Sequence, residues 1–144
     1  MRVEDILKEK GREVVTIEAE ASLDAAIALL AERNIGAVVV AGEGAGTAPV
    51  GILSERDVIR VLAGAPTGYR GSRVEAVMTK DLVTTTLGAT LEEVGAVMTG
   101  RRIRHLPVLD GERLVGILSI GDVVKHRLEA AKAEADALTG YIRG

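Results

Sequence analysis

Continuous apolar runs alternate along this chain with stretches in which apolar residues recur every three or four positions. The runs at residues 37–40 and 50–53 are rich in Val and Ile and predict strands that are buried on both faces. A shorter run at residues 14–17 predicts another strand. Helical spacing predicts one helix after Ser22, a residue that suits the N-cap position, and a second helix at residues 55–63.

The same succession of elements returns in the second half of the chain. Apolar runs predict strands at residues 82–86, 105–109 and 114–118. Helical spacing predicts helices at residues 91–100 and from Asp122 onward. The order strand, helix, strand, strand, helix therefore occurs twice, which predicts an α/β protein with helices packed on sheets.

The two halves also correspond residue by residue. The pattern Gly-x-x-Ser-x-x-Asp occurs at residues 51–57 and again at residues 116–122, each time between a predicted strand and a predicted helix. Earlier positions correspond at a spacing of 68 residues and these at 65, because the Gly-rich loop at residues 42–49 is three residues longer than its counterpart. Residues 3–7 likewise match residues 74–78. An unbroken correspondence of this kind identifies an internal repeat.

Each half is only about 60 to 65 residues long and is too short to bury a full core alone, so we expect the halves to pack face to face. The groove between two related halves is a natural ligand site. We divide the chain into a first repeat at residues 1–66, a linker at 67–72, a second repeat at 73–128 and a helical tail at 129–144.

Composition argues against several classes of protein. No apolar run approaches the roughly 18 residues that span a bilayer, and the polar start of the chain has no apolar signal core, so we expect a cytoplasmic protein. Cysteine does not occur, and with His105 and His126 as the only histidines we expect no metal site. The net charge of −3 and the lack of Phe and Trp disfavour nucleic-acid binding, which uses basic faces and stacking rings. A bound nucleobase would instead lie between aliphatic side chains.

The repeated Gly-x-x-Ser-x-x-Asp pattern, together with the strand that contains Leu106, Pro107 and Val108, resembles a tandem pair of cystathionine β-synthase (CBS) domains. This arrangement is called a Bateman module, here expected as a stand-alone protein, and the resemblance extends to about residue 128. It implies a pseudo-two-fold disc with two clefts, and dimers of such discs. It also implies an adenosine-containing effector such as AMP, ATP, S-adenosylmethionine or NADH, with no required cofactor.

The Ser-x-x-Asp turns have two compatible interpretations. Ser54 with Asp57, and Ser119 with Asp122, can each cap the helix that follows. The same helix start also offers N–H groups and a partial positive charge that suit a phosphate. A serine hydroxyl can donate to a phosphate oxygen, whereas an ionised aspartate only accepts and therefore suits the ribose hydroxyls. We expect serine to contact phosphate and aspartate to contact ribose.

The resemblance implies further ligand-binding positions. Thr16 and Thr84, on the first strand of each half, match positions that line the base or ribose end of the site, although β-propensity alone also explains threonine there. Val38, Leu106 and Pro107 match the strand whose backbone reads adenine in relatives. The first half lacks the proline, so we expect the second cleft to follow the family pattern more closely.

A basic cluster beside the second repeat's strand adds candidates for contact with phosphate. A solvated helix end, where cations favour the helix dipole, explains these residues equally well. Arg56 lies within the first Ser-x-x-Asp turn, where the second half has Gly121, so the two clefts should not be equivalent. The basic cluster consists of Arg101, Arg102, Arg104 and His105.

No motif in the sequence predicts catalysis or a membrane role. The paired acids at residues 4–5 and 92–93 lie at predicted helix starts, where acids are common, so we expect no enzyme. The tail is rich in strong helix formers but has a thin, mostly alanine apolar face. We expect it to dock on the disc or on a second chain, with a simple extension as the alternative.

These observations predict a regulatory homodimer that binds an adenosine-containing ligand between its repeats and signals, through a change of conformation or of dimer geometry, to an unidentified effector protein. The alternative is a ligand-free scaffold whose surfaces serve dimerisation or partner binding. An intact Ser-x-x-Asp turn in both halves favours the sensor.

Overall fold

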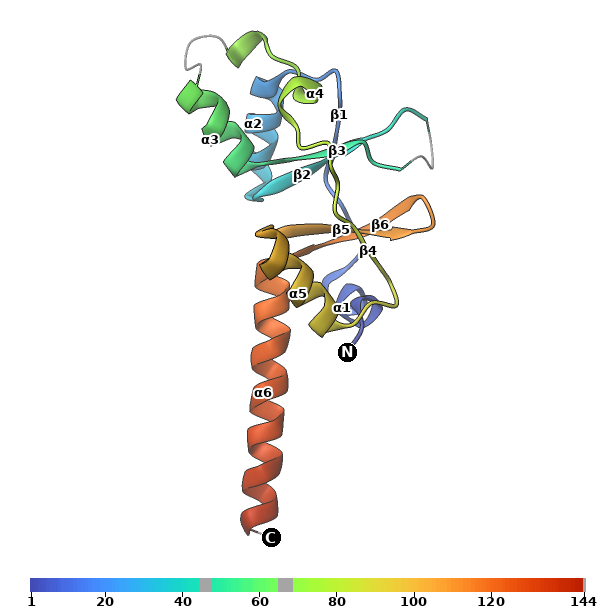
Figure 1. The fold of residues 1–144 in the computed structure, drawn as a ribbon, viewed down its shortest axis with the longest axis vertical. Coiled ribbons are helices and arrows are strands. Elements are labelled where there is room, and N and C mark those ends of the chain that lie inside the picture. Colours follow the sequence, from blue (N-terminus) through green and yellow to red (C-terminus); the bar gives the residue numbers. More distant parts are fainter. Residues whose placement is uncertain (45–47, 65–68, 144) are drawn as a thin grey trace.

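The computed structural model describes residues 1–44, 48–64 and 69–143. Both halves run in the order helix, strand, helix, strand, strand, helix (Figure 1). The first half contains α1 (Val3–Lys10), β1 (Thr16–Glu18), α2 (Leu23–Arg33), β2 (Ala37–Ala41), β3 (Gly51–Ser54) and α3 (Glu55–Gly64). The second half contains the 3-10 turn η1 (Tyr69–Gly71), α4 (Val74–Val77), β4 (Thr85–Thr86), α5 (Leu91–Arg101), β5 (His105–Asp110), β6 (Arg113–Ser119) and α6 (Ile120–Arg143).

Each half forms one three-stranded sheet, in which the first pair of strands is parallel and the second pair is antiparallel. The strands pair in the same register in both halves, with Ile17 opposite Val40 in the first sheet and Thr85 opposite Val108 in the second. The two sheets face each other in the middle of the molecule, and helices cover their outer sides (Figure 1). The predicted α/β fold of two packed repeats is confirmed.

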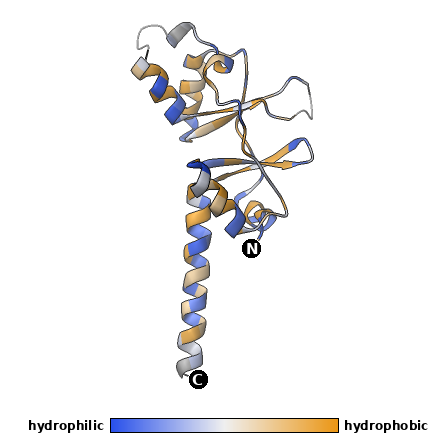
Figure 2. Ribbon diagram, viewed as in Figure 1, coloured by the Kyte–Doolittle hydropathy of each residue, from blue (hydrophilic) through white to orange (hydrophobic). Residues whose placement is uncertain are grey.

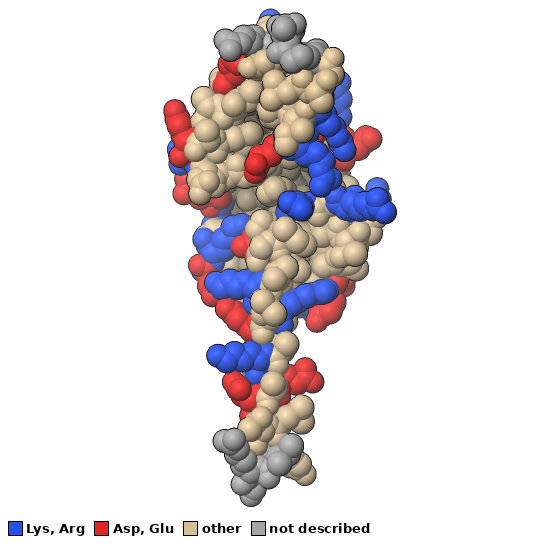
Figure 3. Space-filling model, turned by 90° about the vertical axis from the view of Figure 1, so that its left-hand side faces the viewer, with Lys and Arg blue, Asp and Glu red and all other residues tan. Residues whose placement is uncertain are grey.

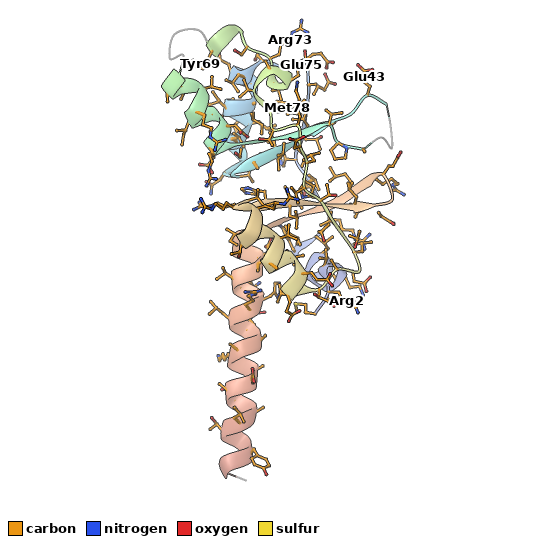
Figure 4. All side chains as sticks on the ribbon, in the orientation of Figure 1. Arg2, Glu43, Tyr69, Arg73, Glu75 and Met78 are labelled. Carbon is orange, nitrogen blue, oxygen red and sulfur yellow. The ribbon has the colours of Figure 1, made fainter. Side chains whose placement is uncertain are left out.

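Helices α1 and α4, which the apolar pattern did not predict, are exchanged between the halves. The Val3 N–H of α1 donates to the Ala89 carbonyl of the second half at 2.9 Å, and the Val74 N–H of α4 donates to the Ala21 carbonyl of the first half at 2.8 Å. Arg2, which precedes α1, and Glu75 of α4 lie at opposite ends of the body (Figure 4). Each half therefore completes its core with a helix from the other repeat.

Two hydrophobic cores lie between the sheets and the helices that cover them (Figure 2). Side chains alternate along a strand, so Val39 and Pro107 point away from these cores toward the facing sheet, where both are buried. The first core contains Leu23, Ala26, Leu30, Val38, Val40, Leu53 and Val74. The second contains Val3, Ile6, Leu7, Leu91, Val94, Met98, Leu106, Val108, Leu118 and Val123.

The largest departure from the predicted strands occurs opposite Pro107. In the first half the Val39 N–H donates to the Val15 carbonyl at 3.2 Å. Pro107 occupies the equivalent position but has no N–H, so the ladder loses this bond and β4 shrinks from the predicted 82–86 to Thr85–Thr86. The other predicted boundaries that fall on described residues lie within two residues of the observed ones.

Two predicted connections lie partly outside the described residues. They are the Gly-rich loop at 42–49 and the linker at 67–72. The predicted end of the first repeat, at residue 66, also lies outside the described residues. Within the linker, Tyr69–Gly71 forms η1.

The last helix of the second repeat and the predicted tail are one continuous helix, α6, of 24 residues. Its first turns pack through Val123 and His126, whereas residues 127–141 are all exposed as α6 projects from the body (Figure 1). The expected docking of the tail on its own disc is therefore wrong for the described residues. No Pro or Gly between residues 122 and 139 turns the helix back. Docking of the tail on a second chain stays a prediction. Among the described residues, no helix is long and apolar enough to cross a membrane.

Candidate functional site

The two Ser-x-x-Asp turns have nearly identical geometry. In the first half the Asp57 carboxylate accepts from the Ser54 N–H at 2.8 Å and from the Ser54 hydroxyl at 3.1 Å. In the second half Asp122 accepts the same two hydrogen bonds from Ser119 at 2.8 and 3.0 Å. Each serine also accepts from the aspartate N–H, at 3.4 and 3.2 Å respectively. The turns thus form caps at the starts of α3 and α6.

The two carboxylates differ in their remaining partners. The second oxygen of Asp57 accepts from the Thr79 hydroxyl at 3.2 Å, and Asp57 is only 8% exposed. All described hydrogen bonds to Asp122 use Oδ2, including one of 2.6 Å from Lys10. The side chain of Asp122 is 20% exposed. Asp122 therefore keeps one oxygen for a ligand, whereas Asp57 has partners on both.

Lys10 makes in the second half the hydrogen bonds that the backbone and hydroxyl of Thr79 make in the first half. The Thr79 N–H donates to the Ile52 carbonyl at 2.8 Å, and the Lys10 ammonium donates to the equivalent Ile117 carbonyl at 2.8 Å. Helix α1 ends at Lys10 and is a turn longer than α4, which brings the lysine to this position. Sequence reasoning missed Lys10, because Asp122 lies 112 residues further along the chain.

The pKa values of two neighbours of Lys10, Asp122 and His105, are shifted from their usual values. Burial alone would raise the pKa of Asp122, but hydrogen bonds from Lys10 and Ser119 outweigh it and hold that pKa below its usual value. Burial, followed by the positive charge of Lys10, lowers the pKa of His105, while Glu55 and Asp122 oppose this shift. The lower pKa favours a neutral imidazole beside an ionised carboxylate.

His105, on the second half, lies at the contact between the two halves. A Cβ built on Gly36 of the first half would lie 3.1 Å from Cε1 of His105 and 2.9 Å from Oε1 of Glu55. Gly36 thus leaves the room that the imidazole occupies. We call the group formed by Lys10, His105, Ser119 and Asp122 the second cleft, after the position that the family resemblance predicts, and Glu55 and Gly36 approach it from the first half.

The basic residues have different surroundings in the structure. Arg104 contributes to the field at His105. Arg56 donates across the halves to the Arg102 carbonyl at 3.4 Å, where Arg102 adopts the left-handed conformation that ends α5. Arg101 and Arg102 are exposed on the described surface.

The other predicted positions include two exposed threonines and three buried strand residues. Thr16 and Thr84 are exposed, and Thr16 lines an open groove between β1 and α2 that contains no residue of either Ser-x-x-Asp turn. The side chains of Val38 and Leu106 are 0% exposed in the two cores, and Pro107 is buried between the sheets. At Val38 and Leu106, therefore, only the main chain can serve a ligand.

A second groove, of about 400 Å³, runs between α2 and α3 and ends at Gly36 and Glu55, beside His105. Its walls are mostly aliphatic. The lining residues are Ile27, Leu30, Ala31, Asn34, Ile35, Gly36, Glu55, Val58 and Ile59.

Two pseudo-symmetric halves, an exchange of their first helices and a capped turn in each half define a tandem-repeat α/β module with its polar site at the contact between repeats. The family model for the CBS domain matches residues 3–64 and 74–129. The chain therefore belongs to the CBS domain family and contains a pair of these domains.

Known proteins agree with this assignment over most of the chain. The CBS domain-containing protein CBSX3, mitochondrial, of Arabidopsis thaliana is 30% identical, over 99% of this chain and 72% of its own length. The crystal structure of the CBS-domain protein ATU1752 from Agrobacterium tumefaciens is 41% identical over 88% of this chain and 99% of that one, with a TM-score of 0.83.

Two further similar structures contain adenosine compounds. The CBS domain pair of protein MJ0100, in complex with 5'-methylthioadenosine and S-adenosyl-L-methionine, is 27% identical over 92% of this chain and 98% of that one, with a TM-score of 0.76. The CBS domain protein PAE2072 from Pyrobaculum aerophilum, complexed with AMP, is 25% identical over 85% and 89%, with a TM-score of 0.75.

Proposed function

We propose that this CBS pair is a regulatory module that binds an adenosine-containing ligand in the second cleft, with AMP, ATP, S-adenosylmethionine and NADH as candidates. The observation that carries the proposal is the juxtaposition of Lys10, His105, Ser119 and Asp122 at the contact between the repeats. The adenosine compounds in the MJ0100 and PAE2072 structures support the class of ligand.

The second cleft offers matching chemistry for a nucleotide. The free oxygen of Asp122 suits a ribose hydroxyl, which is a donor. The Lys10 ammonium suits an anionic group. At the start of α6 the N–H groups of Ile120 and Asp122 already donate, to the Arg104 carbonyl and the Ser119 hydroxyl. Ser119 now donates to Asp122, so its hydroxyl would rotate to reach a phosphate. The ammonium of Lys10 therefore favours the phosphate-bearing candidates over the cationic S-adenosylmethionine.

The aliphatic groove between α2 and α3 supports a place for the base. It ends beside His105 and offers apolar walls to a planar ring. With no Phe or Trp in the chain, such a ring would pack against aliphatic side chains.

The first cleft is the weaker candidate. Asp57 is nearly buried and both of its oxygens accept hydrogen bonds within the fold. A ribose would have to displace the Thr79 hydroxyl, and Arg56 is already bonded to the Arg102 carbonyl. We therefore propose one high-affinity site per chain.

Signalling would follow from the position of Lys10 on α1. A ligand that shares Asp122 with Lys10 changes the attachment of α1, which is part of the second core. The ligand can shift a conformational equilibrium only by its differential affinity for the two states. We propose binding without turnover, and output through an effector protein.

The proposed dimer would use the outer faces of α3 and α6. Ile59 on α3 and its counterpart Val124 on α6 are 64% and 49% exposed. Leu62 and Leu128 extend this apolar face, and Figure 3 shows an uncharged stripe that continues along α6. Exposed apolar surface of this kind marks interaction sites. The ligand-free scaffold remains the second candidate, since the same face supports it.

Thermal unfolding followed by circular dichroism tests the sensor. AMP, ATP, NADH and S-adenosylmethionine are compared with GMP as the control. A ligand at 100 times its dissociation constant should add about 2.7 kcal/mol, a shift of several degrees. Asp122→Asn, which keeps an oxygen for the cap, should abolish the shift, whereas Asp57→Asn should retain it.

No shift with any adenosine compound at millimolar concentration would favour the scaffold. An equal loss in both variants would contradict the choice of the second cleft. The cytoplasmic location stays a prediction, which cell fractionation checks.

A further inference from the structure

A second polar cluster lies where α1 packs against α6, outside the cleft. It contains Glu9 near the end of α1, with His126 and Glu129 one turn apart on α6. One ligand atom from each residue can be chosen so that all three lie within 4.8 Å of one another. Sequence reasoning missed the cluster, because Glu9 and His126 come from opposite ends of the chain.

His126 is the unusual member of this cluster. It is 4% exposed, and its Nδ1 atom is buried without a hydrogen-bond partner among the described residues. A buried polar atom without a hydrogen-bond partner is destabilising and rare in native structures, so it calls for an explanation. The nearest carboxylate oxygen to Nδ1 is on Glu129, at 3.4 Å, and Nε2 lies 3.6 Å from Glu9.

These separations are longer than strong hydrogen bonds, which measure about 2.7–3.2 Å. The separation of Nδ1 from Glu129 matches the spacing of two ligands on one metal ion, whereas Glu9 faces the other ring nitrogen and would turn toward that ion. Ligands about 2.0–2.2 Å from a tetrahedral Zn²⁺ lie roughly 3.4 Å apart. The His126 imidazole and the two carboxylates are also ligand types that Zn²⁺ accepts.

We propose that Glu9, His126 and Glu129 bind a divalent transition-metal ion, best fitted by Zn²⁺, through Nδ1 of His126. Glu9 and Glu129 have half-exposed side chains that can turn toward the ion, while water completes the coordination. The ion would join α1 to α6, and so fasten the exchanged helix to the body.

The charges facing the cluster are compatible with a cation. Lys125 lies 3.5 Å from Glu9 and is exposed, so it can move away when an ion binds. Lys10, the next residue after Glu9, is held by Asp122 instead. The two carboxylates carry a local negative charge that a divalent ion neutralises.

Zinc binding to the full chain tests the site after dialysis against EDTA. Isothermal titration calorimetry with ZnSO4 should show one site per chain, and Zn²⁺ should raise the unfolding temperature. Glu129→Gln and Glu9→Gln are exposed changes that keep the fold, and each should weaken zinc binding roughly tenfold or more. Glu134→Gln, on the same helix outside the cluster, is the matched control and should bind as the wild type does.

Cobalt provides an independent readout, because Co²⁺ in a tetrahedral nitrogen and oxygen site has strong visible absorption bands. These bands should appear in the wild type and be lost in Glu129→Gln. Equal zinc affinity in Glu129→Gln and Glu134→Gln would overturn the proposal, as would the lack of one-site binding at up to millimolar zinc. None of these readouts depends on the nucleotide site.

Discussion

The Lys10 ammonium lies 2.6 Å from the Asp122 carboxylate and so joins the end of α1 to the first turn of α6. The same ammonium donates to the Ile117 carbonyl at 2.8 Å. One side chain therefore ties the N-terminal helix to a strand and a helix of the second repeat. The contact has a different form in the first half, where Thr79 makes the equivalent bonds.

Lys10→Met should lower the free energy of unfolding by about 1 kcal/mol at pH 7, because the pair is partly exposed. The pKa of Asp122 is lowered in the folded state, so its contribution is present above its unfolded pKa, near 3.8, and is lost as the pH falls through the lower folded value. The difference in the free energy of unfolding between wild type and Lys10→Met should therefore shrink at acidic pH. Urea unfolding at several pH values measures it, with the exposed Lys8→Met as the control. A difference that stays constant with pH would contradict this assignment.

His105 should make stability depend on pH near neutrality. Its pKa is lowered in the folded state, so the unfolded chain takes up the proton first as the pH falls below about 6.5. The free energy of unfolding of the wild type should decline in this range, and that of His105→Gln should decline less. Urea unfolding between about pH 7.5 and 5.5 provides the comparison, and parallel curves for the two proteins would contradict the prediction.

Gly116→Ala should destabilise the fold by about 1–3 kcal/mol through overpacking. The new Cβ would lie 2.7 Å from Cδ1 of Leu7, on the exchanged helix α1. Leu7→Ala removes the obstacle, so the double variant should lose less than the sum of the single variants. Chemical unfolding of the four proteins measures the coupling. Gly100→Ala has open space in α5 and should instead add about 0.5–1 kcal/mol.

Ile59→Glu and Val124→Glu should each yield monomers if α3 and α6 form the dimer interface, because each places a charge on the apolar face. Light scattering coupled to size exclusion reports the mass. Val50→Glu is the matched control, since Val50 is 41% exposed and lies outside both helices. A dimer that survives both interface changes, or one that Val50→Glu also dissociates, would argue for another surface.

Local patterns predicted most of the fold. Continuous apolar runs and helical spacing depend on near neighbours, so β2, β3, α3 and α5 were found almost at their observed bounds. The caps at Ser54 and Ser119 were likewise visible, because donor and acceptor lie three residues apart. The shortening of β4 opposite Pro107 departed from the predicted strand at 82–86, although its cause, the missing N–H of proline, is local.

The relations that were missed all join distant parts of the chain. The apolar residues of α1 carry no sign that they pack on the other repeat. Lys10 reaches Asp122, and Glu9 approaches His126, only after α1 crosses to the second half. The path of α6 away from the body was missed as well, because composition shows helix propensity but not where a helix axis points.

The exchange of α1 and α4 determines when each half can close during synthesis on the ribosome. The first core lacks Val74 until α4 has emerged, long after the strands that it covers. Helix α1 emerges before the other elements of the pair but waits for β6 and α6 before it can bury Val3, Ile6 and Leu7. Contacts so distant in sequence slow folding. Helix α1 is therefore made before the other helices and strands of this CBS pair and is among the last of them to find its place.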